Sequence, residues 1–424
     1  MNYNAFLSRL GLEPSQFINR LNEPIKIEGG WIYEVDQKSD DYQCPYCHGD
    51  KLYVHDYNTI DVNCRESSFI KDILRVRKVR LRCKACRKTF TPELRGIGAG
   101  FKTSSQTLQL IYSEFTGELT FAAIGKRYGL STARVMQIFD EDVKFVPRRA
   151  MPEVLCLDEI RFSKDKDQQY VCILYDFHNR EIVDVIRNRR MPYLREYFSE
   201  ISQAERDKVK FVISDMYDAY ATVARHYFKN AVHIVDLFHV IRLLTTAINQ
   251  LRVRTMNMYA IKGTAEYNFM KQHWKLFLCR TNKIPDKFYT HLRTDRRYHF
   301  DELLRYSLKL NIDLFTAYNT LQDFLRYDLK FTYDEALLFI QRIANNLRST
   351  DSPLLHKVGD SYQKWRFEIA SAFSYTQNKI RYTNSIAENI NNQIKTITKA
   401  AYGYTNFDRF RKRVMLVITY KKKP

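Results

Sequence analysis

Glycine and proline are almost missing from the middle of the chain. Between residues 240 and 370 the only glycines are Gly263 and Gly359, and the only prolines are Pro285 and Pro353. Because these two residue types interrupt helices, the stretch is expected to be nearly all helix. Short apolar runs separated by polar turns precede it, in residues 152–236. The chain therefore predicts a multidomain α/β protein in which a strand-rich part is followed by a long all-α region.

The strand-rich part contains five short runs that are typical of β-strands. They are Val154–Leu157, Tyr170–Phe177, Glu181–Ile186, Lys210–Ile213 and Ala231–Val235. Residues 1–40 predict two short amphipathic helices, one around Phe6 and one around Phe17, and residues 104–146 also read as helices. A length of 424 residues exceeds what one hydrophobic core usually organises, so two to four domains are expected.

The charge indicates the kind of partner. Lys and Arg number 68 against 48 Asp and Glu, which gives a net charge of +20 and a pI near 9.4. Such an excess favours nucleic acid as partner, the alternative being a basic, solvated surface. Apolar residues make up 45%, without a run long enough to cross a bilayer or a charged-then-apolar leader, so we expect a cytoplasmic protein.

Four of the eight cysteines form two C-x-x-C pairs, Cys44 with Cys47 and Cys83 with Cys86. Zinc prefers four soft ligands in a tetrahedron, and each pair offers two thiolates from one tight turn. The pattern predicts one structural Zn²⁺ in a zinc ribbon, with a long hairpin between the pairs. His48, His55 and Cys64 are alternative ligands that lack the paired spacing.

Basic and apolar residues partly alternate around the second cysteine pair. Residues 71–90 hold nine basic residues and one acidic residue. A strand with one basic face suits contact with phosphates. The alternative is a solvated edge strand that is guarded by charge.

Residues 120–139 read as a helix-turn-helix. Gly129 is suited to the left-handed conformation that ends a first helix, and Ser131 is a good N-cap for a second. Thr132, Arg134 and Gln137 are then free to enter a major groove of DNA. A plain helical hairpin is the alternative reading.

Three carboxylates are candidates for a metal site. Asp158 and Asp215 each follow a predicted buried strand, where an acid is costly unless a cation pairs with it. Glu388 lies in a helical segment with Lys395 two turns further on, so that Glu388 would hold a cation and Lys395 would contact DNA. For each acid alone, capping of a turn is the alternative. The tail adds Arg409, Arg411 and Arg413 as candidate phosphate contacts, or as a solubilising surface.

These features together resemble the DDE transposases of bacterial insertion sequences, and more narrowly the ISL-three family. The resemblance covers about residues 40–420. It is carried by Leu157-Asp158-Glu159, Ser214-Asp215-Met216-Tyr217, the segment His233–Arg242, the segment from Thr383-Asn384 through Glu388 to Lys395, and Tyr402–Phe407 with the arginines that follow.

The resemblance implies a ribonuclease-H-like core, divided by an all-α insertion. It implies that Asp158, Asp215 and Glu388 are the catalytic triad and hold two Mg²⁺ or Mn²⁺ ions. Asp236 and His239 match a motif that supports the active site, although His239 as an ordinary core histidine is an equal alternative. The implied activity is metal-dependent cleavage of the DNA at the ends of an insertion sequence, followed by transfer of the freed 3′-OH to target DNA. A homodimer would hold the two ends.

The corresponding domain prediction has five parts. They are an N-terminal segment with the zinc ribbon (1–95), the helix-turn-helix (96–149), the first part of the core (150–240), the insertion (241–370), and the core-closing helix with its basic tail (371–424). Two other functions are considered: a catalytically inactive DNA-binding regulator derived from a transposase, and a Holliday-junction or RNA-directed nuclease on the same core.

Overall fold

The structure, a computed structural model, describes the backbone of residues 2–67, 69–94, 97, 102–144, 150–165, 167–258, 263–291, 295–326, 331–377, 380–400 and 404–420. Side chains at 376, 377, 380, 385, 386, 388, 400 and 420 lie outside this description. The chain forms two compact units. One combines Met1–Val146 with Gln393–Pro424, and the other is Pro147–Asn392. The first unit is discontinuous in sequence, and the second lies between its two segments. The five-part domain prediction did not contain this arrangement.

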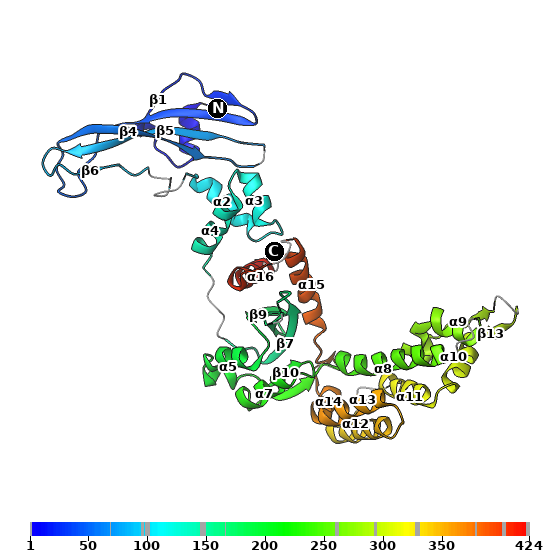
Figure 1. Cartoon of the computed structure of the whole chain (residues 1–424). Helices are drawn as coiled ribbons and strands as arrows, with labels where there is room; N and C mark the ends of the chain where they lie inside the picture. Colours follow the sequence, from blue (N-terminus) through cyan, green and yellow to red (C-terminus); the bar gives the residue numbers. More distant parts are fainter. Residues whose placement is uncertain are drawn as a thin grey trace. The chain divides into compact units, whose positions relative to one another are not determined.

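The first unit begins with a helix on a sheet. Helix α1 (Tyr3–Arg9) packs on a six-stranded sheet of order β1-β3-β5-β4, in which β2 pairs with β3 and β6 with β5 (Figure 1). The Phe6 ring stacks on Tyr33, 3.6 Å between centroids, inside this core. The strands are β1 (Phe17–Asn19), β2 (Ile25–Ile27), β3 (Gly30–Gln37), β4 (Leu52–Asn63), β5 (Ile73–Cys83) and β6 (Thr89–Phe90).

The helix expected around Phe17 is wrong, because this segment is strand β1. Phe17 is buried while the next residue, Ile18, is 55% exposed. A change of face at the very next residue is the two-residue period of a strand, and three residues were too few to reveal it in the sequence.

A cluster of helices follows in the same unit. Helices α2 (Ser105–Glu114), α3 (Phe121–Tyr128) and α4 (Thr132–Asp142) share a core with Leu416 of α16 (Phe407–Tyr420). Gly129 has φ of 68°, and the Ser131 side chain accepts from the N–H of Arg134. The expected end of α3 and the expected cap of α4 are both confirmed.

The second unit is built on a five-stranded sheet of order β11-β10-β7-β8-β9. Strands β7, β8 and β9 are antiparallel neighbours, and β10 and β11 run parallel to β7. All five predicted strands are present, as β7 (Val154–Arg161), β8 (Tyr170–Asp176), β9 (Glu181–Ile186), β10 (Phe211–Ser214) and β11 (Val232–Val235).

Alternation along β7 separates a core face from a polar face. Leu155 and Leu157 pack with α5 (Met191–Ser199) and α7 (Asp218–Tyr227). A short helix, α6 (Gln203–Arg206), lies between these two helices in the sequence. Cys156 and Asp158 have the opposite parity and therefore face away from that core. One strand thus supplies both the packing of the unit and a carboxylate on its other face.

Helices dominate the rest of this unit, as predicted. They are α8 (Leu237–Met258), α9 (Ala265–Gln272), α10 (Phe300–Lys309), α11 (Ile312–Arg326), α12 (Tyr333–Arg348), α13 (Pro353–Lys364) and α14 (Arg366–Ser374), with α15 (Ser385–Ala400) crossing into the first unit (Figure 1). The exceptions are the hairpin β12 (Phe288–Thr290) with β13 (Arg297–His299), the pair β14 (Thr376–Gln377) with β15 (Ile380–Arg381), and short 3₁₀ turns. Within the described residues, no helix combines the length and the apolar character that a bilayer crossing requires.

Candidate active site and metal centre

The two C-x-x-C turns are built alike. In each, the first cysteine donates its N–H to the residue five positions on, and the residue after the second cysteine donates back to the first cysteine carbonyl. His48 and Arg87, which follow the second cysteines, have φ of 57° and 61°. The first turn precedes β4 and the second follows β5, and Leu52 opposite Cys83 closes the long hairpin between them. The hairpin that the spacing required is therefore present.

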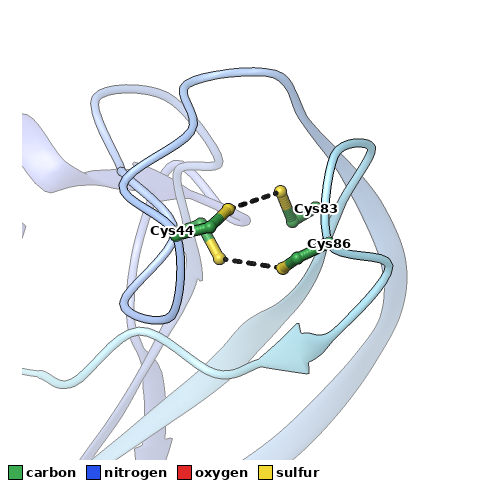
Figure 2. Close-up of side chains that lie close together, drawn as sticks. Cys44, Cys83 and Cys86 are labelled. Atoms are coloured by element: carbon green, nitrogen blue, oxygen red, sulfur yellow. Dashed lines mark hydrogen bonds between the residues drawn. The ribbon is translucent and has the colours of Figure 1, made fainter.

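The four thiols converge on one point. The Sγ atoms of Cys44 and Cys86 are 3.5 Å apart, those of Cys47 and Cys83 are 3.6 Å apart, and all four lie within 4.8 Å of one another (Figure 2). Tetrahedral zinc with Zn–S bonds of about 2.3 Å places its sulfurs about 3.8 Å apart, so the cluster fits this ion. Cys64 is buried elsewhere and bonds to the Val62 carbonyl, which removes it as an alternative ligand.

Three arginines of the basic strand between the cysteine pairs have carboxylate partners on neighbouring strands. Arg75 pairs with Asp61 and Glu34, Arg77 with Asp36, and Arg80 with Asp56. Strand β5 pairs with β3 on one side and β4 on the other, so the edge-strand reading is wrong. These contacts give the arginines partners on the neighbouring strands without any phosphate.

The residues predicted to enter DNA lie at the start of α4. Thr132 and Gln137 are exposed, and half-buried Arg134 donates to the Gln137 side chain at 2.8 Å. Gln137 in turn donates to Glu141. Arg134, Gln137 and Glu141 are thus linked along one face of α4.

The arginines of α16 have different environments. Arg413 is 2% exposed and donates to the carbonyls of Gly117 and Leu119 at 3.0 and 2.7 Å. Arg409 donates to both oxygens of Asp140 on α4. These contacts attach α16 to the helix cluster, and the burial of Arg413 does not fit the phosphate contact predicted for it. Arg411 is half-buried and Lys395 is exposed.

The candidate acids meet along one edge of the second sheet. Strand β10 pairs with β7 through Ile213 opposite Cys156, and with β11 through Ser214 opposite Val235. Continuing this register places Asp158 of β7 beside Asp215 and Asp236, which directly follow the parallel strands β10 and β11. Strand β7 itself continues to Arg161 against β8, so Asp158 stands where β7 loses its neighbour β10.

Burial and the neighbouring carboxylates shift the pKa values of Asp215 and Asp158 upward. Burial, followed by the carboxylates of Glu159 and Asp158, raises the pKa of Asp215 to about 7. Burial also raises the pKa of Asp158. The N–H of Glu159 and the amide of Asn391 oppose this rise, because their hydrogen bonds favour the ionised form of Asp158. The Asp215 Oδ1 atom is buried, and no hydrogen-bond partner for it occurs in the described part of the chain. Such an oxygen is suited to a hard divalent cation.

Helix α15 is attached to this edge. The Asn391 amide donates to Asp158 Oδ2 at 2.7 Å across 233 residues of sequence, and Tyr175 donates to the Asn391 oxygen. Near the helix start, Asn384 donates to the Leu157 carbonyl at 3.3 Å. Position 388 is three residues before Asn391, hence on the same face of the helix. The Glu388 side chain itself lies outside the described residues.

Asp236 and His239 form the start of α8. Asp236 is 4% exposed and accepts from the N–H of Phe238 at 3.2 Å, so it caps the helix. His239 is half-buried, and its positive form lowers the pKa of Asp158. Both predicted support residues therefore lie beside the acids.

Glu159, Arg189 and Asn391 also belong to the site, and none of them was selected from the sequence. Glu159 pairs with Arg189, whose guanidinium also lies over the ring of Tyr217, 4.8 Å from its centroid. The spacing of Asn391, three after Glu388, was a usable signal. Nothing in the sequence marked Arg189, because its contact with Glu159 arises only from the fold.

Among the described residues, the cysteine cluster is the one group of three or more potential ligands within 4.8 Å of one another. Asp158 and Asp215 supply hard oxygens, the ligand type that Mg²⁺ and Mn²⁺ prefer. The residues present therefore fit a divalent cation at the sheet edge and zinc at the cysteines.

Two comparisons with known proteins indicate the family of the chain. A sequence profile of ISL3-type (ISL-three) DDE transposases, described as "Transposase", matches residues 155–414. The "Transposase for insertion sequence element IS1001" of Bordetella parapertussis is 25% identical over 269 residues, which cover 61% of this chain and 59% of that protein. The match thus spans less than two thirds of that relative's length.

A chain whose match to a transposase profile covers more than half its length belongs to a defined class of proteins, the transposases. It is a member of the ISL3 family of DDE transposases.

Proposed function

We propose that the protein binds the ends of an insertion sequence, cleaves them by hydrolysis of a phosphodiester, and joins the 3′-OH ends to target DNA. The observation that carries the proposal is the hydrogen bond from Asn391 to Asp158. It supports a site in which Asp158, Asp215 and Glu388 act together, although a long helical insertion separates Asp215 from Glu388 in the sequence.

The sheet order and strand directions favour a ribonuclease-H-like core in this proposal, with α8 to α14 as its insertion. Bound Mg²⁺ or Mn²⁺ supplies Lewis-acid activation of the attacking oxygen and stabilisation of the leaving 3′ oxygen. Asp158, Asp215 and Glu388 hold the cations, and Asn391 orients Asp158. Asp236 fixes the start of α8 so that His239 faces the acids.

End recognition is assigned to the first unit. The zinc ribbon and a helix-turn-helix formed by α3 and α4 bind duplex DNA, with Thr132, Arg134 and Gln137 reading bases and Arg411 and Lys395 contacting phosphates. Arg409 and Arg413 are given a structural role instead, because they bond within the unit. Two copies, one for each end, form the synaptic complex.

The test compares Asp158→Asn, Asp215→Asn and Glu388→Gln with wild type on DNA that carries one end of the element. Each substitution keeps the shape of the side chain and removes its charge. We expect cleavage and strand transfer in Mg²⁺ to fall by at least about 10³-fold, with end binding in a gel shift nearly unchanged. Asp218→Asn is the matched control, because Asp218 is exposed on α7 and pairs with Lys364.

Full cleavage by any of the three variants would remove that acid from the proposed site. A wild-type protein that binds ends without cutting them would favour the catalytically inactive regulator. Hydrolysis without joined product would favour a nuclease.

A further inference from the structure

A cavity opens beside the acids and leads away along the helical region. Its volume is about 510 Å³, and it lies between α8 and α13. Asp215 and His239 line the end at the sheet, followed by Arg242 and Leu243 on α8 and by Leu354 and Lys357 on α13. A volume in the range of about 300–1,000 Å³ is typical of sites for small ligands, and it is far too small for a DNA duplex.

The two cations of this groove stand on opposite walls. Arg242 and Lys357 are both exposed, and within the described residues neither has a carboxylate partner at ion-pair distance. Neighbouring cations of α12 and α13 differ in this respect, since Arg348 pairs with Asp360 and Lys364 with Asp218. Two cations without local acids across a narrow groove are complementary to a chain of phosphates.

Apolar surface lies beside these cations. Leu243 is 37% exposed, and Leu354 is half-buried on the facing helix. Proteins that bind single strands combine a basic groove along the backbone with apolar or aromatic surface for the bases. The groove has both elements, and it begins at an acid of the active site.

The end wall of the groove is rigid. Trp365 is 5% exposed, and its ring contacts His233, 6.2 Å between centroids. His233 is bonded to Ser214 Oγ at 2.9 Å, directly before Asp215. Trp365 therefore supports the wall by packing and leaves the base contacts to the leucines.

We propose that this groove binds the unpaired nucleotides next to the scissile phosphodiester, with Arg242 and Lys357 on their phosphates and Leu243 and Leu354 against a base. The inference rests on the proposed function, because it uses Asp215 as part of the cleavage site. It assigns to the start of the helical insertion the task of holding one strand in line with the acids. Duplex binding by the first unit is independent of it.

The test uses the full chain and end DNA that carries 4-thiothymidine on either side of the scissile phosphate. In the wild type, irradiation should crosslink one of these positions to a peptide that contains Leu243 or Leu354. In Arg242→Gln with Lys357→Gln, we expect crosslinking and cleavage to fall by about tenfold or more. End binding in a gel shift should change by less than about threefold, since the first unit is intact. Lys309→Gln, an exposed cation on α10, is the control and should behave as wild type.

A double variant that cleaves as fast as wild type would overturn the groove proposal and leave the proposed function intact. So would a wild-type crosslink that maps only outside α8 and α13. If the wild type crosslinks to the groove without cutting in Mg²⁺, the proposed function fails while the binding site for the strand stands.

Discussion

At the scale of single residues, Asp215 is the acid whose ionisation the fold alters in a way that can be tested. Its pKa rises from 3.8 to about 7 through burial and the neighbouring carboxylates. Because the folded state holds this proton more tightly than the unfolded state, the contribution of Asp215 to stability is present below about pH 4 and is lost as the pH rises to about 7. The metal-free protein is therefore destabilised by Asp215 at neutral pH.

Asp215→Asn is accordingly expected to raise the free energy of unfolding without added Mg²⁺. At about pH 8 the gain should be on the order of 2 kcal/mol, roughly half the full linkage, since the side chain is not fully buried. Near pH 3.5 it should vanish, because the wild-type carboxyl is then protonated in both states. Urea unfolding at the two pH values measures it. Asp218→Asn should show no such gain, and an equal gain at both pH values would point to packing instead.

Single residues also show where sequence reasoning succeeds. Asp158 and Asp215 were identifiable because each follows an apolar run in the sequence, and an acid there needs a partner, although β7 continues beyond Asp158 to Arg161. Glu159 and Arg189 were not identifiable, because their ion pair joins the end of β7 to the loop before α5 and depends on how the strands and helices pack. The edge-strand alternative for β5 failed for the same reason, since β5 pairs with β3, which carries the partners Glu34 and Asp36.

At the scale of secondary structure elements, α16 is the component whose role the sequence concealed. Leu416 enters the core of the helix cluster, and the Arg413 guanidinium lies over Phe121, 5.6 Å from the ring centroid. Arg413→Met would leave the carbonyls of Gly117 and Leu119 without this partner. We expect the substitution to destabilise the first unit by about 3 kcal/mol, measured by urea unfolding, and to weaken end binding in the same preparation.

The control for Arg413 is Lys126→Met, an exposed position at the end of α3. It should change the free energy of unfolding by less than about 0.5 kcal/mol. Unchanged stability in Arg413→Met would mean that α16 is held by its apolar face and by the pair of Arg409 with Asp140, without a contribution from Arg413.

The cysteine turns give a second prediction at this scale. Cys83→Ser should abolish the bound zinc, which is expected at one ion per chain in wild type, because three ligands and a hydroxyl hold the ion far more weakly. Metal analysis of the purified chain measures this, and end binding should fall with the zinc. Cys279→Ser, a half-buried cysteine outside the cluster, should retain the full zinc content. Retention of zinc by Cys83→Ser would reject the site.

Longer elements were the ones that the sequence could predict. The five strands of the second sheet and the helices α3 and α4 are long enough to show their periodicity and their caps. Strand β1 and the hairpin β12–β13 have three residues per strand, so their pattern is indistinguishable from a piece of helix or a loop. Short elements are determined mainly by the neighbours against which they pair.

At the scale of the whole molecule, the chain leaves its first unit at residue 146 and returns to it at Gln393, within α15. Sequence order suggested a DNA-binding part followed by a catalytic part. The return was not predictable, because the bonds that reveal it, such as Arg409 to Asp140, join residues 269 positions apart. Helix α15 thus carries Asn391 of the acid site in one unit and ends in the other.

This return has a consequence for protein synthesis. Under the proposed function, the ribosome releases α2, α3 and α4 long before it makes α16, so an unfinished polypeptide carries a recognition module that lacks the contacts of Leu416 and Arg413. A premature stop codon upstream of α16 would then yield fragments that compete poorly for the element's ends. Such fragments would be weak inhibitors of the complete enzyme.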